Sequence, residues 1–184
     1  MNLPSRLVDL HEALEAHHVP HAFGGAIALA YLTLDPRGTS DIDVNLFVPA
    51  DDSASALGAL PAGIDQPEGT EGVIARDGQV RLWWNATPVD LFFDYAPIHA
   101  DAARNLRIVP FEGSEIPVLG PVELVVFKVM FDRTRDWADI EAVARAGTLD
   151  VDAVREALRS MLEPGDHRFA RLDAAIRLAA EAEA

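Results

Sequence analysis

The sequence of 184 residues contains no cysteine. Without thiols the chain forms neither disulfides nor thiolate metal sites, as is usual for proteins of a reducing cytoplasm. Long apolar runs are missing too: no stretch reaches the roughly 18 residues that a membrane-spanning helix needs, and the first residues lack the apolar core of a secretory signal. We therefore expect a cytoplasmic protein that does not span a membrane.

Basic residues are also scarce. The chain has 15 Lys and Arg against 30 Asp and Glu, a formal net charge of -15, and its basic residues are not gathered into a stripe. Since nucleic-acid affinity depends largely on Lys and Arg that neutralise phosphates, this balance argues against DNA or a large RNA as an unaided partner. A small anionic ligand stays compatible, because a bound divalent cation inverts the local field. The charge also suits a cationic acceptor, or acidity that serves solubility alone.

What the chain does have is enough apolar residues, 49%, for one well-packed core. The pattern predicts an α+β (α/β sandwich-like) fold: a mixed β-sheet with flanking helices over residues 1–120, followed by a helical region over 121–184 that packs on it. An amphipathic helix is expected over 4–17 and a hairpin about Asp77-Gly78. Further strands are expected at HAF, DIDVNLFV, PVDLFFDY and within LRIVPFEGSEIPVLG, and helices at AIALAYL, PVELVVFKVMF, DWADIEAVARA, VDAVREALRSML and HRFARLDAAIRLAAEAEA.

Two aspartates open the expected strand DIDVNLFV. Because side chains alternate along a strand, Asp41 and Asp43 face the same side, while Ile42 faces the other. Like charges held this close repel unless a cation lies between them, and Mg²⁺ prefers oxygen ligands of this kind. Asp90, on the later strand PVDLFFDY, has the setting of a third ligand.

A glycine pair precedes the two aspartates. Gly24 and Gly25 lie between an expected strand and an expected helix, where missing side chains let a phosphate approach backbone N–H groups and the helix N-terminus. Glycine at this point also suits a tight turn alone. The order of strand, Gly-Gly, helix, loop, Asp-Ile-Asp and a third aspartate on a strand is much more restrictive than either motif.

This order resembles the nucleotidyltransferase superfamily related to DNA polymerase β. The stretches GGAIALAYLTLDPRGTSDIDVNLFV and PVDLFF look like the superfamily's glycine motif leading into D-x-D and like its third-aspartate strand. The stretch FKVMFDRTRDWADI resembles the helix pair that follows the sheet in small bacterial members. Among members, the chain is most similar to minimal nucleotidyltransferases of toxin–antitoxin and abortive-infection systems and to aminoglycoside nucleotidyltransferases.

The resemblance implies a two-metal site for phosphoryl-type transfer. Asp41, Asp43 and Asp90 would be the catalytic residues and the ligands of two Mg²⁺ ions about 3.5–4 Å apart. Asp41 and Asp43 would bridge both ions, whereas Asp90 would bind the ion that activates an acceptor hydroxyl and is placed to accept its proton. The predicted nucleotide-binding residues are Gly24, Gly25, Arg37, Ser40 and Lys128.

Several of these residues have a second interpretation. Many members of the superfamily have Ser where Gly25 stands, so here backbone contacts alone would hold the triphosphate. Ser40 also suits a cap at the start of a strand, and Arg37 an ion pair with Asp35. Lys128 lies in an apolar helical run and needs a phosphate or a carboxylate partner, because an unpaired buried ammonium is costly.

For other residues, a role in packing is the preferred interpretation over a role in catalysis. Arg133, Asp136 and Asp139 are expected to fix a helix junction through salt bridges rather than to do chemistry. Trp83 and Trp84 face opposite sides of a strand, so one belongs to the core. The other is placed to stack on a base, to line an acceptor groove or to pack at the rim of the sheet.

The histidines near the first helix permit two interpretations. His17, His18 and His21 are compatible with a metal site, but they straddle a helix end and a strand start, where helix-end or surface histidines are common. His11 and His99 look incidental.

Three functions fit these observations. The first is transfer of a nucleoside monophosphate from an NTP, such as ATP, to a hydroxyl of a small molecule or a protein, with release of pyrophosphate. The second is a non-catalytic relative that binds a nucleotide or a partner protein, for example as a toxin–antitoxin component. The third is an unrelated magnesium-dependent phosphohydrolase, but the sequence does not contain the usual motifs of such enzymes. Metal-dependent pyrophosphate release, as opposed to nucleotide binding alone, separates the first two.

Overall fold

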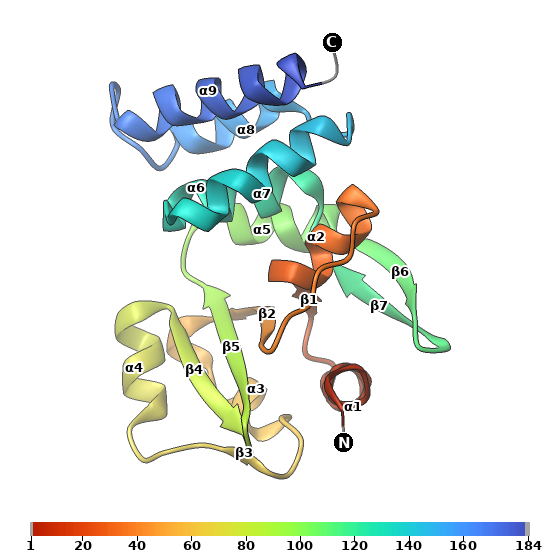
Figure 1. Cartoon of the computed structure of the whole chain (residues 1–184). Coiled ribbons are helices and arrows are strands. Elements are labelled where there is room, and N and C mark those ends of the chain that lie inside the picture. The colour runs from red at the N-terminus through yellow and green to blue at the C-terminus, as the bar shows by residue number, and fades with distance from the viewer. Residues whose placement is uncertain (1, 183–184) are drawn as a thin grey trace. The chain divides into compact units, whose positions relative to one another are not determined.

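The computed structural model describes residues 2–182, and Figure 1 shows the course of the chain. By their internal contacts the residues form two compact units, which are described one at a time. The first consists of Met1–Ile27 and Arg37–Leu119, and the second of Ala28–Pro36 and Gly120–Ala184. The predicted domains, 1–120 and 121–184, stay a prediction; the two units differ from them in the placement of residues 28–36 and of Gly120.

The first unit is built on a mixed sheet. Within the described residues the sheet has seven strands in the order β3-β4-β5-β2-β1-β7-β6. The pairs β2–β5 and β1–β7 are parallel, and the other neighbouring pairs are antiparallel. The strands are β1 (His21–Phe23), β2 (Ile42–Pro49), β3 (Ile64–Asp65), β4 (Gln79–Trp84), β5 (Thr87–Asp94), β6 (Arg107–Phe111) and β7 (Ser114–Val118).

The two central strands alternate as the sequence predicts. On β5, Val89, Leu91 and Phe93 are fully buried, whereas Asp90 and its neighbours on the other face are partly exposed. On β2, Ile42, Val44 and Leu46, which have the opposite parity to Asp43, are fully buried as well. This alternation puts apolar side chains on one face of the sheet and leaves the aspartates on the other.

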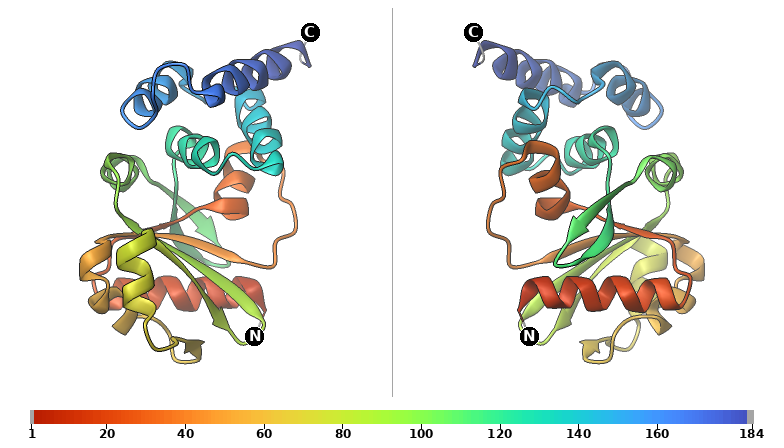
Figure 2. Two further views of the ribbon diagram at one scale, coloured as in Figure 1. Left: turned by 90° about the vertical axis from the view of Figure 1, so that its left-hand side faces the viewer. Right: turned by 90° about the vertical axis from the view of Figure 1, so that its right-hand side faces the viewer.

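Helix α1 (Leu3–Ala16) covers the apolar face. Its residues Leu7, Leu10 and Leu14 recur at helical spacing and are fully buried. Arg6 of the same helix donates a hydrogen bond to the hydroxyl of Thr87, which has the same parity on β5 as the buried core residues. Figure 2 shows α1 (red) running along the sheet on one side. The aspartates of β2 and β5 therefore face away from α1.

The predicted hairpin about Asp77-Gly78 is wrong. The segment before Gly78 forms helix α4 (Thr70–Asp77), and Gly78 ends it in the left-handed conformation, with its N–H donating to the carbonyl of Ile74 at 2.7 Å. Asp-Gly serves here as a helix end, because a glycine with positive φ suits a C-cap as well as a turn. The hairpin lies one strand later, where Asn85, at φ 55°, helps to connect β4 to β5.

The remaining elements of the first unit follow the sequence prediction more closely. The segment LRIVPFEGSEIPVLG supplies β6 and β7, joined by a turn at Glu112-Gly113 in which both residues have positive φ. The other helices of this unit are the 3-10 turn η1 (Ala50–Asp52), α3 (Ala54–Gly58) and α5 (Pro97–Asn105), and α2 (Gly25–Thr33) begins in it.

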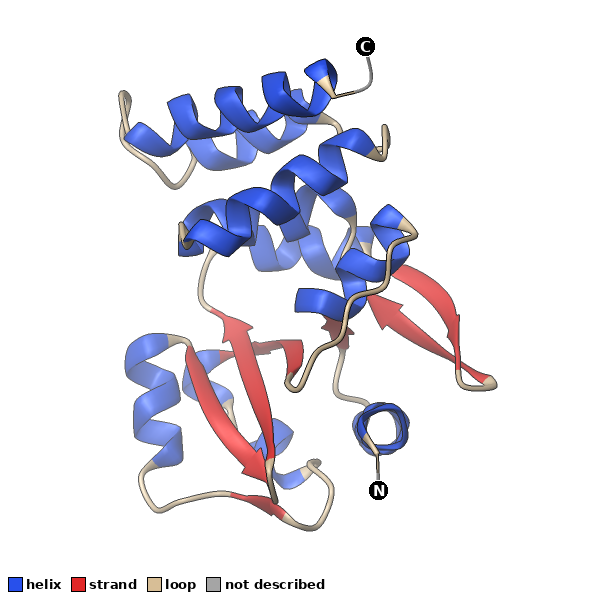
Figure 3. Cartoon of the chain, viewed as in Figure 1, coloured by secondary structure: helices blue, strands red, loops and turns tan. Residues whose placement is uncertain are grey.

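The second unit is helical (Figure 3). Helix α7 packs against α9, and α6 packs against α7 and α8. The helices predicted after residue 120 are confirmed, with ends that shift by a few residues. Their bounds are α6 (Pro121–Phe131), α7 (Thr134–Arg145), α8 (Val151–Arg159) and α9 (His167–Glu181). Among residues 2–182, no helix combines the length and the apolar character needed to cross a membrane.

Candidate active site

Two of the three predicted catalytic aspartates lie side by side. Asp43 of β2 and Asp90 of β5 are direct Cα partners in the parallel strand pair. Side chains of residues paired in this way project from the same face of a sheet. Both side chains are partly exposed, in contrast to the buried apolar residues next to them in each strand. The structure thus brings together two carboxylates that are 47 positions apart in the chain.

Asp41 completes the group from just outside the strand. It lies in a bend directly before β2, two positions ahead of Asp43, and is partly exposed. The hydroxyl of Thr39 donates to its carboxylate oxygen Oδ1, and this contact helps to fix the side chain. The three aspartates therefore gather at the start of β2 and on the adjacent part of β5.

Arg81 is a residue of this site that the sequence analysis missed. It lies opposite Asp90 in the antiparallel pair β4–β5, and its Nε and its terminal nitrogen donate to the two carboxylate oxygens of Asp90 at 2.7 and 2.6 Å. This is a bidentate ion pair, the strongest geometry between these groups. The sequence QVRLWW contains a signal for this residue, because Arg81 alternates with the apolar residues Val80 and Leu82. The pairing of Arg81 with Asp90 could be predicted only from the correct position of the hairpin between β4 and β5.

The pKa of Arg81 reports the negative charge of the site. The hydrogen bonds to Asp90 raise the pKa of the guanidinium, partial burial opposes this, and the charge of Asp90 adds to the increase. Asp41 and Asp43 raise the pKa of Arg81 further through their charges. All three carboxylates are therefore close enough to Arg81 to raise the pKa of its guanidinium.

The donor set fits Mg²⁺. Three carboxylates on one face of a sheet offer several hard oxygen ligands with water access, which is the chemistry that Mg²⁺ prefers. Asp41, Asp43 and Asp90 would hold the metal. Because both oxygens of Asp90 accept hydrogen bonds from Arg81, the guanidinium competes with a metal ion for this carboxylate.

The glycine pair lies directly against Asp43. The N–H of Gly24 donates to the carbonyl of Asp43 at 2.9 Å. Gly25 has a φ of +50°, and a Cβ on it would lie 1.8 Å from Oδ2 of Asp43. Neither the backbone conformation nor the space tolerates a side chain at Gly25. Helix α2 starts at Gly25, next to the aspartates.

Two predicted nucleotide-binding residues lie in the loop between α2 and β2. Ser40 is exposed and directly precedes Asp41, whereas Arg37 is partly buried. Both residues lie within four positions before Asp41, the first aspartate of the D-x-D motif. Their role in nucleotide binding stays a prediction.

The two tryptophans of β4 face opposite sides, as predicted. Trp84 is buried and lies under the guanidinium of Arg6, on the side covered by α1. Trp83 is 48% exposed and pairs across the hairpin with Pro88. It has the same parity on its strand as Arg81, so its indole lies on the face that carries the aspartates.

Comparison with known proteins identifies the family. The model of the nucleotidyl transferase AbiEii toxin family, assigned to type IV toxin–antitoxin systems, matches residues 7–183. The chain belongs to the AbiEii family. No curated protein matches the sequence of this AbiEii member. The predicted resemblance to nucleotidyltransferases of toxin–antitoxin systems is thereby confirmed.

Solved structures support the same fold for this AbiEii chain. The solution structure of the antibiotic-resistance factor ANT(2″)-Ia has a TM-score of 0.52 at 13% identity, over 97% of this chain and 93% of the other. The crystal structure of ANT(2″)-Ia with adenylyl-2″-tobramycin has a TM-score of 0.52 at 11% identity, over 98% of each chain. The crystal structure of an antigenic nucleotidyltransferase-like protein from Paracoccidioides brasiliensis has a TM-score of 0.50 at 15% identity, over 93% of this chain and 92% of the other. The predicted α+β nucleotidyltransferase fold is confirmed.

In the second unit of the AbiEii chain, Lys128 has carboxylate partners. Its side chain is buried, and its Nζ lies 2.6 Å from Oδ2 of Asp139 and 3.5 Å from Oδ1 of Asp136, both also buried. Asp136 in addition accepts hydrogen bonds from the backbone and the side chain of Arg133. These ion pairs join α6 to α7, as the sequence predicts. The role of Lys128 in nucleotide binding stays a prediction.

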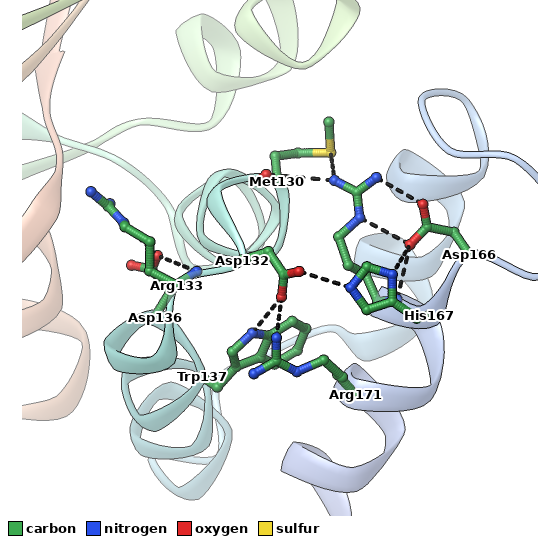
Figure 4. A network of polar contacts seen from close by, with 9 residues as sticks. Met130, Asp132, Arg133, Asp136, Trp137, Asp166, His167 and Arg171 are labelled. Atoms are coloured by element: carbon green, nitrogen blue, oxygen red, sulfur yellow. Dashed lines mark hydrogen bonds and ion pairs between the residues drawn. The ribbon is translucent and has the colours of Figure 1, made fainter.

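A second polar cluster ties α9 to the same helix junction (Figure 4). Asp132, at the end of α6, accepts hydrogen bonds from Nε1 of Trp137 at 2.8 Å, from Nε2 of His167 at 2.8 Å and from Arg171. Desolvation opposes the charge of Asp132, but the bonds from His167 and Trp137 and the charge of Arg171 outweigh it and lower the pKa of this carboxyl. These contacts link the end of α6 to α7 and α9 within the second unit.

Proposed function

We propose that the protein transfers a nucleoside monophosphate from an NTP to a hydroxyl acceptor, with release of pyrophosphate and with Mg²⁺ as the cofactor. The observation that carries the proposal is the register of Asp43 with Asp90, with Asp41 two positions before, on the sheet face turned away from α1. Membership of a nucleotidyl transferase family supports the reaction class.

Each residue of the site has a role in this reaction. Asp41 and Asp43 would hold two Mg²⁺ ions, which neutralise charge on the attacking and leaving oxygens of such a transfer. Asp90 would hold one of them and accept the proton of the acceptor hydroxyl. The backbone at Gly24 and Gly25 leads into the N-terminus of α2, where N–H groups are oriented to bind phosphate oxygens.

The donor and the acceptor follow from the surroundings of the site. We propose an NTP donor bound by Gly24, Gly25, Arg37 and Ser40. The exposed indole of Trp83 offers a stacking surface for a base or an acceptor on the same sheet face. The net charge of -15 favours a cationic small molecule or a protein hydroxyl over nucleic acid as the acceptor.

The family suggests the biological setting. The AbiEii family is described as the toxin of a type IV toxin–antitoxin system. We propose that the transfer reaction is the toxic activity, that it takes place in the cytoplasm and that an antitoxin protein is the partner.

A non-catalytic binding role is the second candidate. It is favoured by one observation, the two hydrogen bonds with which Arg81 occupies both oxygens of Asp90. While this ion pair persists, the charge and the hydrogen bonds of Arg81 weaken the binding of a metal ion and of a proton to Asp90. The chain would then bind a nucleotide or a partner without transferring anything.

The test is a calorimetric titration of ATP, CTP, GTP and UTP, each with Mg²⁺, together with an assay of pyrophosphate release. The wild type is compared with an Asp41→Asn, Asp43→Asn double variant. The matched control is Asp51→Asn, Asp52→Asn, which removes two exposed carboxylates of η1. We expect Mg²⁺-dependent binding of one nucleotide and release of pyrophosphate in the wild type and the control, and neither in the site variant. Binding without release under an acceptor screen would favour the second candidate, and equal release from all three proteins would refute the site.

A further inference from the structure

Two histidines and a glutamate meet on the sheet face opposite to the aspartates. His11 and Glu15 lie one turn apart on α1, and His21 is the first residue of β1. One side-chain ligand atom from each of the three lies within 4.8 Å of the other two. Nδ1 of His11 and Nε2 of His21 are 3.0 Å apart. The sequence analysis grouped His21 with His17 and His18 and treated His11 as incidental; the fold selects a different set.

The backbone fixes which nitrogen of His21 is available. Its Nδ1 lies 2.8 Å from the carbonyl oxygen of Val19. A carbonyl only accepts hydrogen bonds, so Nδ1 carries the proton and the lone pair is on Nε2, which points to His11. His21 is buried, and its hydrogen bond to Val19 fixes the orientation of the ring. A neutral imidazole whose second nitrogen donates to a backbone carbonyl is the usual form of a metal-ligating histidine.

We propose that His11, Glu15 and His21 bind a transition-metal ion of the zinc class. Two imidazole nitrogens and one carboxylate oxygen suit Zn²⁺, which leaves a fourth tetrahedral position for water. Two nitrogens bound to one tetrahedral Zn²⁺ lie about 3.3 Å apart, so the rings need to separate by a few tenths of an ångström. Without a metal, Nδ1 of His11 donates a hydrogen bond to the lone pair on Nε2 of His21. Metal binding replaces this hydrogen bond and requires His11 to carry its proton on Nε2. Glu15, which is exposed, leaves the site open to solvent.

The site is separate from the aspartate cluster. His21 pairs with Leu46 of β2, and Leu46 has the opposite parity to Asp43 on that strand. Side chains of opposite parity project from opposite faces, so the ion would lie on the α1 side of the sheet. It would tie α1 to β1 and stabilise the first unit. Binding of this ion therefore does not depend on the aspartates.

The experiment is a titration of chelator-treated, full-length protein with Zn²⁺, followed by calorimetry and by the thermal midpoint. Co²⁺ serves as a spectroscopic probe, because its visible absorption distinguishes tetrahedral from octahedral coordination. We expect one Zn²⁺ per chain, a higher midpoint with metal, and a loss of at least about tenfold in affinity in His11→Ala and in Glu15→Gln. Glu15 is exposed and His11 is only partly buried, so these variants should fold even if His21→Ala does not.

Two controls separate this site from others. His17→Ala removes an exposed histidine whose Nδ1 is already bonded to the carbonyl of Ala13, and it should bind Zn²⁺ like the wild type. The Asp41→Asn, Asp43→Asn variant should also retain the tight Zn²⁺ site. Absence of a stoichiometric Zn²⁺ site in the wild type would overturn the proposal. So would a site that His11→Ala and Glu15→Gln leave intact.

Discussion

Arg81 and Asp90 form a bidentate ion pair across β4 and β5, with hydrogen bonds of 2.7 and 2.6 Å. This pair places a fixed positive charge where the proposed reaction needs a metal ion. The guanidinium also offsets part of the repulsion among the three carboxylates that share this sheet face. The same pair sets the arginine in competition with Mg²⁺ for Asp90.

Removal of the Arg81 charge should therefore strengthen metal binding. In Arg81→Gln, both oxygens of Asp90 become available and one positive charge is lost, so we expect Mg²⁺ affinity to rise by about tenfold, the order expected of one unit charge near a protein surface. Stability should change by less than about 1 kcal/mol, because the arginine is exposed. Calorimetry with Mg²⁺ at low ionic strength measures the effect. Arg76→Gln, which breaks an exposed bidentate pair with Asp77, is the control and should leave the Mg²⁺ affinity unchanged. A weaker affinity in Arg81→Gln would show that the arginine supports the metal site instead.

Gly25 should be intolerant of any side chain. In Gly25→Ala the new Cβ would collide with Oδ2 of Asp43, and the φ of +50° is strained for alanine. We expect a loss of about 1–3 kcal/mol in the free energy of unfolding and, because Asp43 is displaced, loss of Mg²⁺-dependent nucleotide binding. Gly72→Ala is the matched control: it lies in α4 in open space and should stabilise the protein by about 0.5–1 kcal/mol. Denaturant unfolding and nucleotide titration separate the two effects. Normal nucleotide binding by a folded Gly25→Ala protein would contradict the placement of Asp43 in the site.

Alternation along β2 and β5 predicts which residues of each strand share a face, because that signal is local. The grouping of Asp90 with Asp41 and Asp43 came from the resemblance to nucleotidyltransferases, and the pairing of β2 with β5 places Asp43 beside Asp90. Arg81 was missed because its position depends on strand pairing. Asp77-Gly78 is compatible with a hairpin or with a helix end, and the choice is decided by the packing of α4 on β4, a tertiary contact.

Side-chain contacts between distant segments could not be predicted from the sequence, because they also depend on how the elements pack. The sequence shows that Lys128 needs a partner but not which one, since Asp136 and Asp139 reach it only once α6 and α7 pack together. His11 and His21 are ten positions apart, and a chain reversal between α1 and β1 brings their rings into contact. Periodicity predicts which face a residue occupies, whereas its partner depends on how the elements pack.

Lys128 should be essential for the stability of the second unit. It is the one lysine in the sequence and is 6% exposed, with both of its carboxylate partners buried. Lys128→Met leaves the carboxylates of Asp136 and Asp139 without their shared cation, and we expect a loss of about 3–5 kcal/mol. Lys128→Met combined with Asp139→Leu should recover part of it, because one buried charge is then removed as well. Denaturant unfolding measures both variants.

The same lysine provides a reporter of local opening. An amine-reactive reagent should acylate Lys128 slowly in the native protein and rapidly in denaturant, and the N-terminal amine serves as the internal reference. Mass spectrometry of peptides resolves the two sites. Native-state labelling of Lys128 as fast as that of the N-terminus would mean that its ion pairs with Asp136 and Asp139 are open in solution.

Finally, stability should fall as the pH drops below the ordinary pKa of histidine, because His99 is buried in neutral form. Desolvation lowers the pKa of His99 below 6.5, although its hydrogen bond to Ala96 and the charge of Asp94 oppose this shift. Between the lowered pKa and about pH 6.5, the unfolded chain binds a proton at His99 and the folded chain does not. The contribution of His99 to the free energy of unfolding is therefore complete above about pH 6.5 and is lost as the pH falls from 6.5 to the lowered pKa. Thermal midpoints measured between pH 7.5 and 5.5 with chelator present should show the decrease. His99→Gln should reduce the slope, whereas His17→Gln, at an exposed position, should retain it. An unchanged slope in His99→Gln would assign the pH dependence to other groups.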